Sequence, residues 1–201
     1  MTTAPSRPRG FTLLELLVAL AIFAVLAAMA YGGLETVLDA RARTEAEARH
    51  LSRLQLAYSI MERDVDNAVD RSVRDQYGDP QPPVIGGTGQ TPLLRVTRGG
   101  WRNPGGRRHS SLQRIAYHLD QDQLVRDSYP VLDRAPDTKP YRQPLLDGVS
   151  RVGVRFLDAA GQWHDSWPPL GAQAGGLPRA VEVTVDQKRS GTLTWLFGLP
   201  S

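Results

Sequence analysis

The chain has 201 residues, a formal net charge of +3 and no cysteine. This length allows one or two domains, with one favoured, and the missing cysteines exclude disulfide bonds and thiolate metal sites. The charge does not indicate a nucleic-acid-binding protein, because two basic residues, Arg7 and Arg9, lie in a short leader. Removal of that leader would leave 22 basic residues against 21 acidic ones.

The first element is an apolar run behind this basic leader. Residues 16–31 contain no charged or strongly polar side chain. The longer stretch 11–34 has enough residues to cross a hydrocarbon layer of about 30 Å as a helix. Its only charged side chain is Glu15, and a carboxylate at membrane depth costs about 2.5–3.5 kcal/mol. We therefore treat Glu15 as a functional candidate.

Three interpretations of this start compete. The first is an uncleaved signal anchor, and the second is a secretory signal removed after residues 28–30, Ala-Met-Ala. The third is a prepilin-like leader that is cut between Gly10 and Phe11, so that the apolar run stays on the mature chain. Glu15 argues against the second interpretation, because the apolar region of a secretory signal tolerates an acid poorly. Under the positive-inside rule the arginines of the leader place the N-terminus in the cytoplasm.

A charged connector and an amphipathic helix follow. Residues 39–49 are mostly charged residues and alanine without proline, which indicates a solvated helix. Apolar residues recur at steps of three and four from 48 to 69, which predicts a buried stripe. The pattern predicts one helix from Phe11 to about Arg71. Two helices broken at the Gly32-Gly33 pair remain the alternative, because helical glycines are costly.

Beyond a Pro- and Gly-rich stretch at 79–92, which predicts a loop, the hydrophobic period changes to two. About seven short strands are predicted. They cover residues 94–96, 115–119, 124–127, 152–156, 162–167, 181–185 and 193–197. Further loops are predicted at 101–111, 130–144 and 168–178. Turns of hairpin length favour antiparallel pairing. The predicted fold class is therefore α+β, with the stripe of a long N-terminal helix packed on antiparallel β-sheet.

The sequence contains no recognisable catalytic or metal-binding set. The four histidines are His50, His109, His118 and His164, and they form no close pair and no H-E-x-x-H motif. Residues 120–122, Asp-Gln-Asp, lack the further ligands of a calcium loop and predict a solvated turn. We expect no catalytic residue, no metal, no cofactor and no small-molecule substrate.

One basic stretch leaves an alternative open. Arg98, Arg102, Arg107 and Arg108 lie around Trp101, a composition that nucleic-acid-binding surfaces share. The nearly neutral charge of the chain without its leader favours a solvated loop instead, so no nucleic-acid partner is expected. The tryptophans predict core or interface positions.

Residues 10–15, Gly-Phe-Thr-Leu-Leu-Glu, resemble the class III signal of type IV pilins and type II secretion pseudopilins. In that family a membrane peptidase cuts after the glycine and methylates the new N-terminal amine. The resemblance implies that Gly10 is the cleavage-site residue and Phe11 the N-methylated residue. It also implies that Glu15 pairs with the N-terminal amine of a neighbouring subunit during assembly. Opposite charges buried together cost far less than charges buried apart.

Later blocks resemble the J-type minor pseudopilin of type II secretion systems, in the expected order. These blocks cover residues 61–64, 94–104, 112–119, 124–127, 132–134 and 163–168. The resemblance implies a pilin-like fold and three parts of the chain. They are a prepilin leader at 1–10, the transmembrane half of the helix at 11–34 and a periplasmic domain at 35–201.

The same resemblance implies a structural component of the pseudopilus tip that supports protein export across the outer membrane. Its implied partners are the prepilin peptidase, the inner membrane, the I- and K-type minor pseudopilins and other pseudopilins. Small residues in the membrane half permit close helix packing, and Ala24 and Ala28 are the candidates for contact with the I-type helix. A minor pilin of a type IV pilus or DNA-uptake system, and a membrane-anchored periplasmic enzyme or binding module, remain as alternatives.

Overall fold

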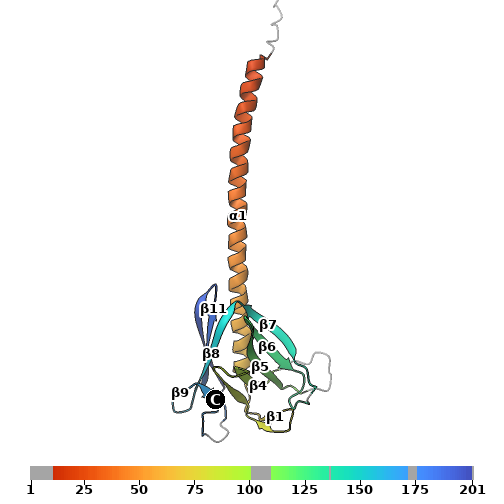
Figure 1. Ribbon diagram of the computed structural model, residues 1–201, viewed down its shortest axis with the longest axis vertical. Coiled ribbons are helices and arrows are strands. Elements are labelled where there is room, and N and C mark those ends of the chain that lie inside the picture. Colours follow the sequence, from red (N-terminus) through yellow and green to blue (C-terminus); the bar gives the residue numbers. More distant parts are fainter. Residues whose placement is uncertain (1–10, 101–109, 136, 172–175, 201) are drawn as a thin grey trace, which may run out of the picture. The chain divides into compact units, whose positions relative to one another are not determined.

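The computed structural model describes residues 11–100, 110–135, 137–171 and 176–200 (Figure 1). The chain forms two compact units, residues 1–51 and residues 52–201. In its described part, the first unit consists almost entirely of helix. The second unit holds the end of that helix and all the strands.

Helix α1 spans Leu13–Asp66 as 54 residues without a break at the glycine pair, so the two-helix alternative is wrong. Within the pair's own turn, the Thr36 hydroxyl donates a hydrogen bond of 2.9 Å to the Gly32 carbonyl. The predicted end at about Arg71 is also wrong. After Asp66 the backbone turns to the sheet, where Val69 N donates to Thr97 O at 2.9 Å. The sheet therefore takes over the backbone donor that a longer helix would have used.

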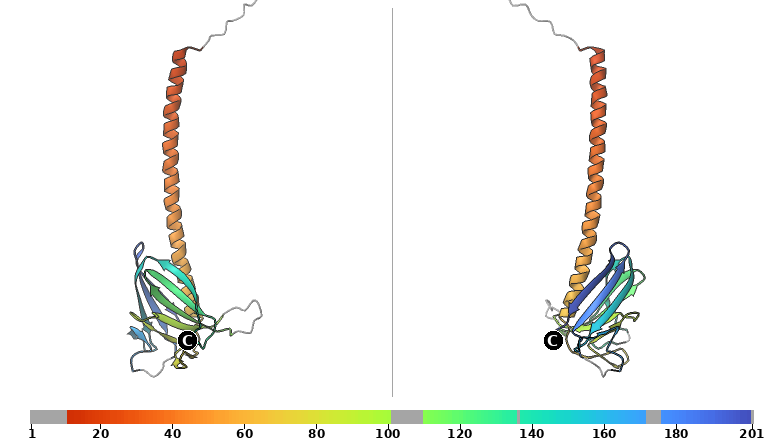
Figure 2. Two further views of the ribbon diagram at one scale, coloured as in Figure 1. Left: turned by 45° about the vertical axis from the view of Figure 1, so that its right-hand side comes forward. Right: turned by 90° about the vertical axis from the view of Figure 1, so that its left-hand side faces the viewer.

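The strands form three antiparallel sheets. The smallest pairs β1 (Val73–Arg74) with β2 (Pro80–Gln81). The six-stranded sheet has the order β10 (Ser166–Trp167), β3 (Val84–Gly87), β4 (Leu94–Arg98), β5 (Gln113–Asp120), β6 (Gln123–Tyr129) and β7 (Tyr141–Asp147). The four-stranded sheet has the order β12 (Gly191–Gly198), β11 (Ala180–Gln187), β8 (Val149–Leu157) and β9 (Trp163–His164). Figure 2 shows the two larger sheets side by side in the second unit.

All seven predicted strand regions are extended in the structure, but one of them is divided. Residues 162–167 were expected to form one strand, whereas β9 pairs with β8 and β10 pairs with β3. The chain therefore changes sheet at Asp165. The loop predictions at 79–92 and 130–144 are partly wrong, because β2 and β3 lie in the first stretch and β7 begins in the second. Proline and glycine in these stretches indicate a loop, so the strands cannot be recognised from the local sequence.

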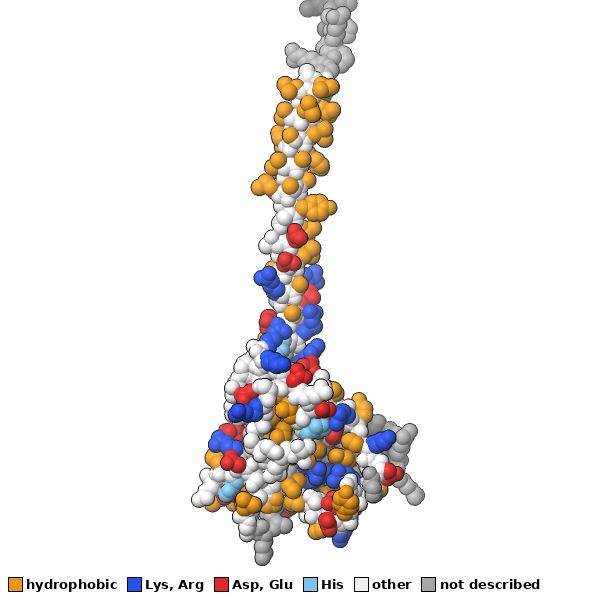
Figure 3. Space-filling view, viewed as in Figure 1, with side chains coloured by type: hydrophobic (Ala, Val, Ile, Leu, Met, Phe, Trp, Pro, Cys, Tyr) orange, Lys and Arg blue, Asp and Glu red, His pale blue; other side chains and the backbone are white. Residues whose placement is uncertain are grey.

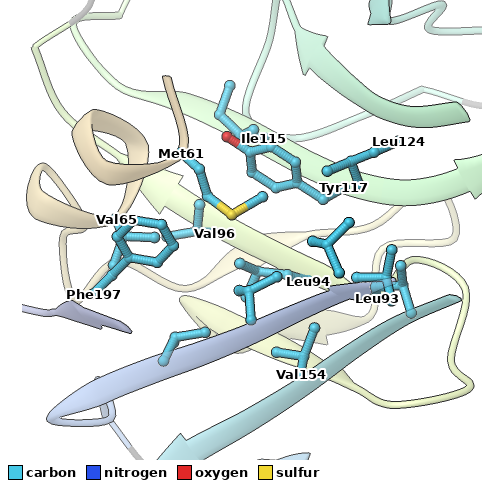
Figure 4. Close-up of a cluster of buried hydrophobic side chains, with 14 of the residues drawn as sticks. Met61, Val65, Leu93, Leu94, Val96, Ile115, Tyr117, Leu124, Val154 and Phe197 are labelled. Atoms are coloured by element: carbon cyan, nitrogen blue, oxygen red, sulfur yellow. The ribbon is translucent and has the colours of Figure 1, made fainter. Parts of the chain in front are cut away.

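The core lies between the last turns of α1 and the two larger sheets (Figure 4). Met61 and Val65 point from the helix toward the strands, and Phe197 comes from β12. All three side chains are almost fully buried. Burial of such apolar side chains contributes about 1.5–3 kcal/mol each. From Leu54 onward the predicted stripe packs on strands from both larger sheets. Its first members, Ala48 and Leu51, are exposed, so the predicted burial of that end is wrong.

A polar link and a tight backbone contact hold the sheets in register. The Thr88 hydroxyl accepts a hydrogen bond from Val154 N at 2.9 Å and donates one to Val154 O at 3.1 Å. Gly86 lies so close to the next strand that an added Cβ would stand 2.2 Å from the Leu93 carbonyl oxygen. The Thr88 link connects the end of β3 to β8, so the two larger sheets form one structure around the core.

Candidate functional site

The start of α1 holds the residues that the leader motif singled out. Thr12 precedes the helix, and its amide and hydroxyl donate to the Glu15 carboxylate at 3.4 and 3.3 Å. In return, Glu15 N donates to the Thr12 hydroxyl at 3.3 Å. This reciprocal arrangement is a capping box. Phe11 lies just before it with an exposed side chain, and Gly10 lies outside the described residues.

The capping box places a carboxylate at the positive end of the helix dipole, where an acid is favourable. It also gives Glu15 hydrogen-bond donors from its own chain, which lowers the cost of a polar group in apolar surroundings. The arrangement supplies no nucleophile or proton relay. The arrangement supplies a hydrogen-bonded carboxylate one helical turn after residue 11.

On the face that Figure 3 displays, α1 carries apolar side chains from this cap to the charged turns that follow. Its best 18-residue window has a mean hydropathy of 2.7. In the described part of the chain, α1 is the one helix whose length and composition fit a membrane span. Ala24 and Ala28 are exposed here, and their spacing of four residues puts them on one face of the helix.

The following turns are charged. Glu45 pairs with Arg41 at 2.9 Å and with Arg49 at 3.6 Å, in both cases across one helical turn. These side chains remain largely exposed, and pairs of this kind support a solvated helix by a few tenths of a kcal/mol. The structure thus agrees with the predicted helical connector at 39–49.

Asp64, on the last turn of α1, is a completely buried acid. The Tyr117 hydroxyl donates to its Oδ2 at 2.6 Å, and Arg126 donates to both carboxylate oxygens at 2.6 and 3.1 Å. Arg98 adds a second guanidinium, with Nε 3.2 Å from Oδ1. An acid near a helix C-terminus is disfavoured by the helix dipole. The three partners, from β4, β5 and β6, compensate for this and fix the helix end on the sheet.

The network changes the pKa of its members. Burial and then the Asp64 charge raise the pKa of Tyr117 well above its ordinary value. Burial lowers the pKa of Arg98, and Asp64 opposes that shift. Burial would also lower the pKa of Arg126, but the hydrogen bonds and charge of Asp64 outweigh it and raise the pKa. Both arginines and the tyrosine therefore stay protonated at neutral pH, and the network is a structural clamp.

Asp64 was not among the candidate residues from the sequence, although its position in the helix was a signal of burial. It lies between Met61, Val65 and Ala68, all buried, so a lone acid stands on the apolar face of the helix. Arg98 was assigned to a solvated basic loop, and that was wrong, because it is 8% exposed and lies against Asp64. The side chain of Arg98 points toward the core because successive residues of β4 alternate between the two faces of the sheet.

The other candidate residues are not brought together. His118 lies 3.6 Å from Asp127, and His164 lies 2.7 Å from Asp158 on another sheet. Among the described residues no group of His, Cys, Asp or Glu could hold a metal ion. The predicted turn at 120–122 separates β5 from β6. Of the tryptophans, Trp167 is buried.

Several of the other positions considered in the sequence fall beyond what the structure describes. They are Trp101, Arg102, Arg107, Arg108 and His109. The nucleic-acid alternative rested on Arg98 and on these positions other than His109. Arg98 is the one residue of this set that the structure describes, and it is buried against Asp64. The nucleic-acid alternative therefore loses that residue as an exposed cation.

Comparison with known proteins identifies the family. The profile for protein J of the type II secretion system matches residues 32–199. The chain belongs to the type II secretion system protein J family. A prokaryotic N-terminal methylation motif matches residues 5–31.

Relatives match this chain over most of their length. Type II secretion system protein J of Klebsiella pneumoniae is 33% identical over 192 residues, which cover 95% of this chain and 94% of the relative. The protein of the same description from Vibrio cholerae is 33% identical over 199 residues, covering 94% and 86%. A chain in the crystal structure of the GspK–GspI–GspJ complex from enterotoxigenic Escherichia coli matches with a TM-score of 0.67 and 25% identity. That match covers 76% of this chain and 98% of the other.

These matches confirm the predicted pilin-like α+β fold and the predicted function as a minor pseudopilin of type II secretion. Proteins of this family are structural pseudopilins. The methylation motif and the apolar N-terminal helix make the chain a membrane-anchored member.

Proposed function

We propose that this minor pseudopilin is cut between Gly10 and Phe11 and N-methylated at Phe11, and that it then serves as a structural subunit without catalytic activity. The observation that carries this proposal is the capping box at the start of α1. It places the Glu15 carboxylate in the first turn after the cleavage position, within the stretch that matches the methylation motif.

We further propose a single-pass topology in the inner membrane. Residues 1–10 form the leader on the cytoplasmic side, 11–34 the transmembrane half of the helix and 35–201 the periplasmic domain. Arg7 and Arg9 support this orientation, because basic residues beside a span favour the cytoplasmic side. The charged turn around Glu45 supports a polar environment past the span.

In the assembled filament, Glu15 pairs with the N-terminal amine of a neighbouring subunit. The single chain satisfies this carboxylate with Thr12, through hydrogen bonds of 3.3 to 3.4 Å. An incoming ammonium group forms a stronger, charge-assisted bond. When the amine replaces Thr12 as the hydrogen-bond partner of Glu15, the assembled state is favoured. The acid then has a polar partner both before and after assembly.

The partners in this proposal are the I- and K-type minor pseudopilins. The likeness to a chain of the GspK–GspI–GspJ complex supports them. Contact with the I-type helix is proposed at Ala24 and Ala28, where small side chains let two helix backbones approach. The soluble domains add a second contact.

Mass analysis of the membrane-derived protein, produced with and without the prepilin peptidase, tests the processing step. The mature chain is expected to begin at N-methylated Phe11 only when the peptidase is present. Gly10→Val should block cleavage, because a branched side chain replaces the small residue at the cut. Gly32→Ala is the matched control and should be processed normally, since nothing lies within 4 Å of the added Cβ. A mature N-terminus at Tyr31, or an intact Met1 with the peptidase present, would contradict the proposal.

A further inference from the structure

The face of the six-stranded sheet that is turned away from α1 carries unpaired positive charge. Along β4, Leu94 and Val96 point into the core, so Arg95 and Thr97 lie on the opposite face. Arg114 of β5 stands directly across from Thr97. Arg95 and Arg114 are therefore diagonal neighbours on this face, within reach of each other's long side chains.

Arg114 is 1% exposed, which is unusual for a charged side chain. Its guanidinium donates to Pro83 O and to the Thr97 hydroxyl, both at 2.6 Å, and to Pro82 O at 2.9 Å. All three acceptors are uncharged. Its Nε is buried and has no hydrogen-bond partner. The side chain thus holds the segment before β3 but finds no negative charge there.

Two more guanidiniums join Arg114. Tyr129 stands opposite Arg114 on β6, and the Arg134 guanidinium lies 4.8 Å from the centre of the Tyr129 ring. The Nε of Arg95 is buried without a partner, like that of Arg114. We call Arg95, Arg114 and Arg134 the arginine cluster.

No carboxylate of the described residues lies within 4 Å of a nitrogen in this cluster. Burial, followed by the charge of Arg134, lowers the pKa of Arg95, and Asp75 opposes this shift from farther away without reversing it. The Asp75 oxygens already accept bonds from two backbone amides and the Gln81 side chain. Burial, followed by the charges of Arg95 and Arg134, lowers the pKa of Arg114 to about 9. Arg95 and Arg114 therefore remain cations at neutral pH.

We propose that the arginine cluster is a binding site for an oxyanion, which is a carboxylate or a phosphate-type group. Buried cations without a counter-charge are costly, and the planar fork of a guanidinium fits the two oxygens of such a group. A protein side chain and a free inorganic anion would offer the same chemistry. This inference does not depend on the processing or on the assembly of the chain.

Thermal unfolding of the full-length protein in a neutral detergent, followed by tryptophan fluorescence, tests the site. Sodium phosphate and a tri-aspartate peptide are the probes. Sodium chloride at matched ionic strength and a tri-asparagine peptide are their controls. A probe that binds the folded state raises the midpoint temperature in a saturable way, and we expect this for at least one probe and for neither control. Saturation by phosphate identifies a free anion as ligand, whereas saturation by the peptide alone identifies a carboxylate carried by a protein.

Substitutions connect the effect to the cluster. Arg95→Gln and Arg134→Gln should each raise the dissociation constant roughly tenfold or more, because each removes a charge-assisted partner of the anion. Neither guanidinium donates a hydrogen bond to another described side chain, and Arg134→Gln loses only the contact with the Tyr129 ring, so both variants should fold. Arg151→Gln, a control on the four-stranded sheet whose side chain is 79% exposed, should bind like the unchanged protein. No saturable effect of either probe, or equal binding by all three variants, would overturn the proposal.

Discussion

At the scale of single residues, Asp64 joins parts of the chain that are far apart in sequence. Arg98 lies 34 positions later and Arg126 lies 62 positions later. Loss of the carboxylate would leave two buried cations without compensation, and breaking such a pair costs about 3–5 kcal/mol. The network therefore contributes a connection between helix and sheet more than a large net gain in stability.

Tyr117→Phe measures the contribution of the phenol to this network. The variant loses a hydrogen bond to a charged group, so the free energy of unfolding should fall by about 1.5–3 kcal/mol at pH 7. Because the folded pKa of Tyr117 is raised, its contribution is complete below the unfolded pKa of about 10 and declines as pH rises above it. The difference between the two proteins should therefore shrink above pH 10, by up to about 1.4 kcal/mol per pH unit.

Urea denaturation at pH 7, 10 and 11 provides these free energies. The opposing titration of Arg114, whose folded pKa is lowered, occurs in both proteins and cancels in the difference. A difference that stays constant from pH 7 to pH 11 would contradict the raised pKa of the phenol.

Residue-level prediction from the sequence was possible where the surroundings of a side chain are local, and it failed where they are tertiary. Glu15 could be selected as a candidate because it is the one acid at the start of a long apolar run. The lone acid on the apolar face of the helix was a local signal for Asp64, but its pairing with Arg98 joins distant segments and cannot be predicted from either segment alone. Arg114 is similar, since its partners at Pro82 and Pro83 come from a segment more than thirty positions away.

At the scale of elements, the long helix could be predicted because its signals repeat over many turns. Strand β3 could not be, because its four residues, Val-Ile-Gly-Gly, follow two prolines and locally indicate a loop. What makes it a strand is its pairing with β4 and β10. The divided strand at 162–167 was also unpredictable, since the alternation along the chain does not say which sheet each half joins.

Gly86→Ala tests the close approach of β3 and β4. The added Cβ would stand 2.2 Å from a backbone oxygen, so one of the strands must shift. Overpacking of this kind costs about 1–3 kcal/mol, and chemical denaturation should report that loss. Gly198→Ala on β12 is the control, with nothing within 4 Å of the new atom, and its free energy of unfolding should stay within about 0.5 kcal/mol. Equal stability of both variants would show that the strands can separate without cost.

At the scale of the whole molecule, the proposed membrane half of α1 is exposed at almost every position against the described part of the chain. Ala24→Leu with Ala28→Leu should weaken co-purification of the full-length protein with the I-type pseudopilin, because larger side chains separate the two helix backbones. Ala19→Leu with Ala30→Leu is a matched control. It adds the same apolar volume on the opposite face of the helix, given about 100° per residue.

Co-purification from membranes and secretion by cells provide the two readouts, and the thermal unfolding of the soluble domain verifies that the fold is intact. Equal co-purification by both double variants would mean that this face has no part in choosing the partner. Equal loss by both would mean that added volume anywhere on the helix disturbs assembly.

The last strand has a consequence for the synthesis of the protein. Trp195 and Phe197 of β12 lie with ring centres 5.9 and 5.2 Å from that of Tyr58, on the helix that begins the second unit. The layer over this helix is therefore completed only by β12, which is synthesised about 140 residues after Tyr58. A chain that terminates early keeps an apolar helix face uncovered, which is the kind of surface that cellular proteases and chaperones recognise. A product that ends before β12 would therefore be a target for removal before it could enter a filament.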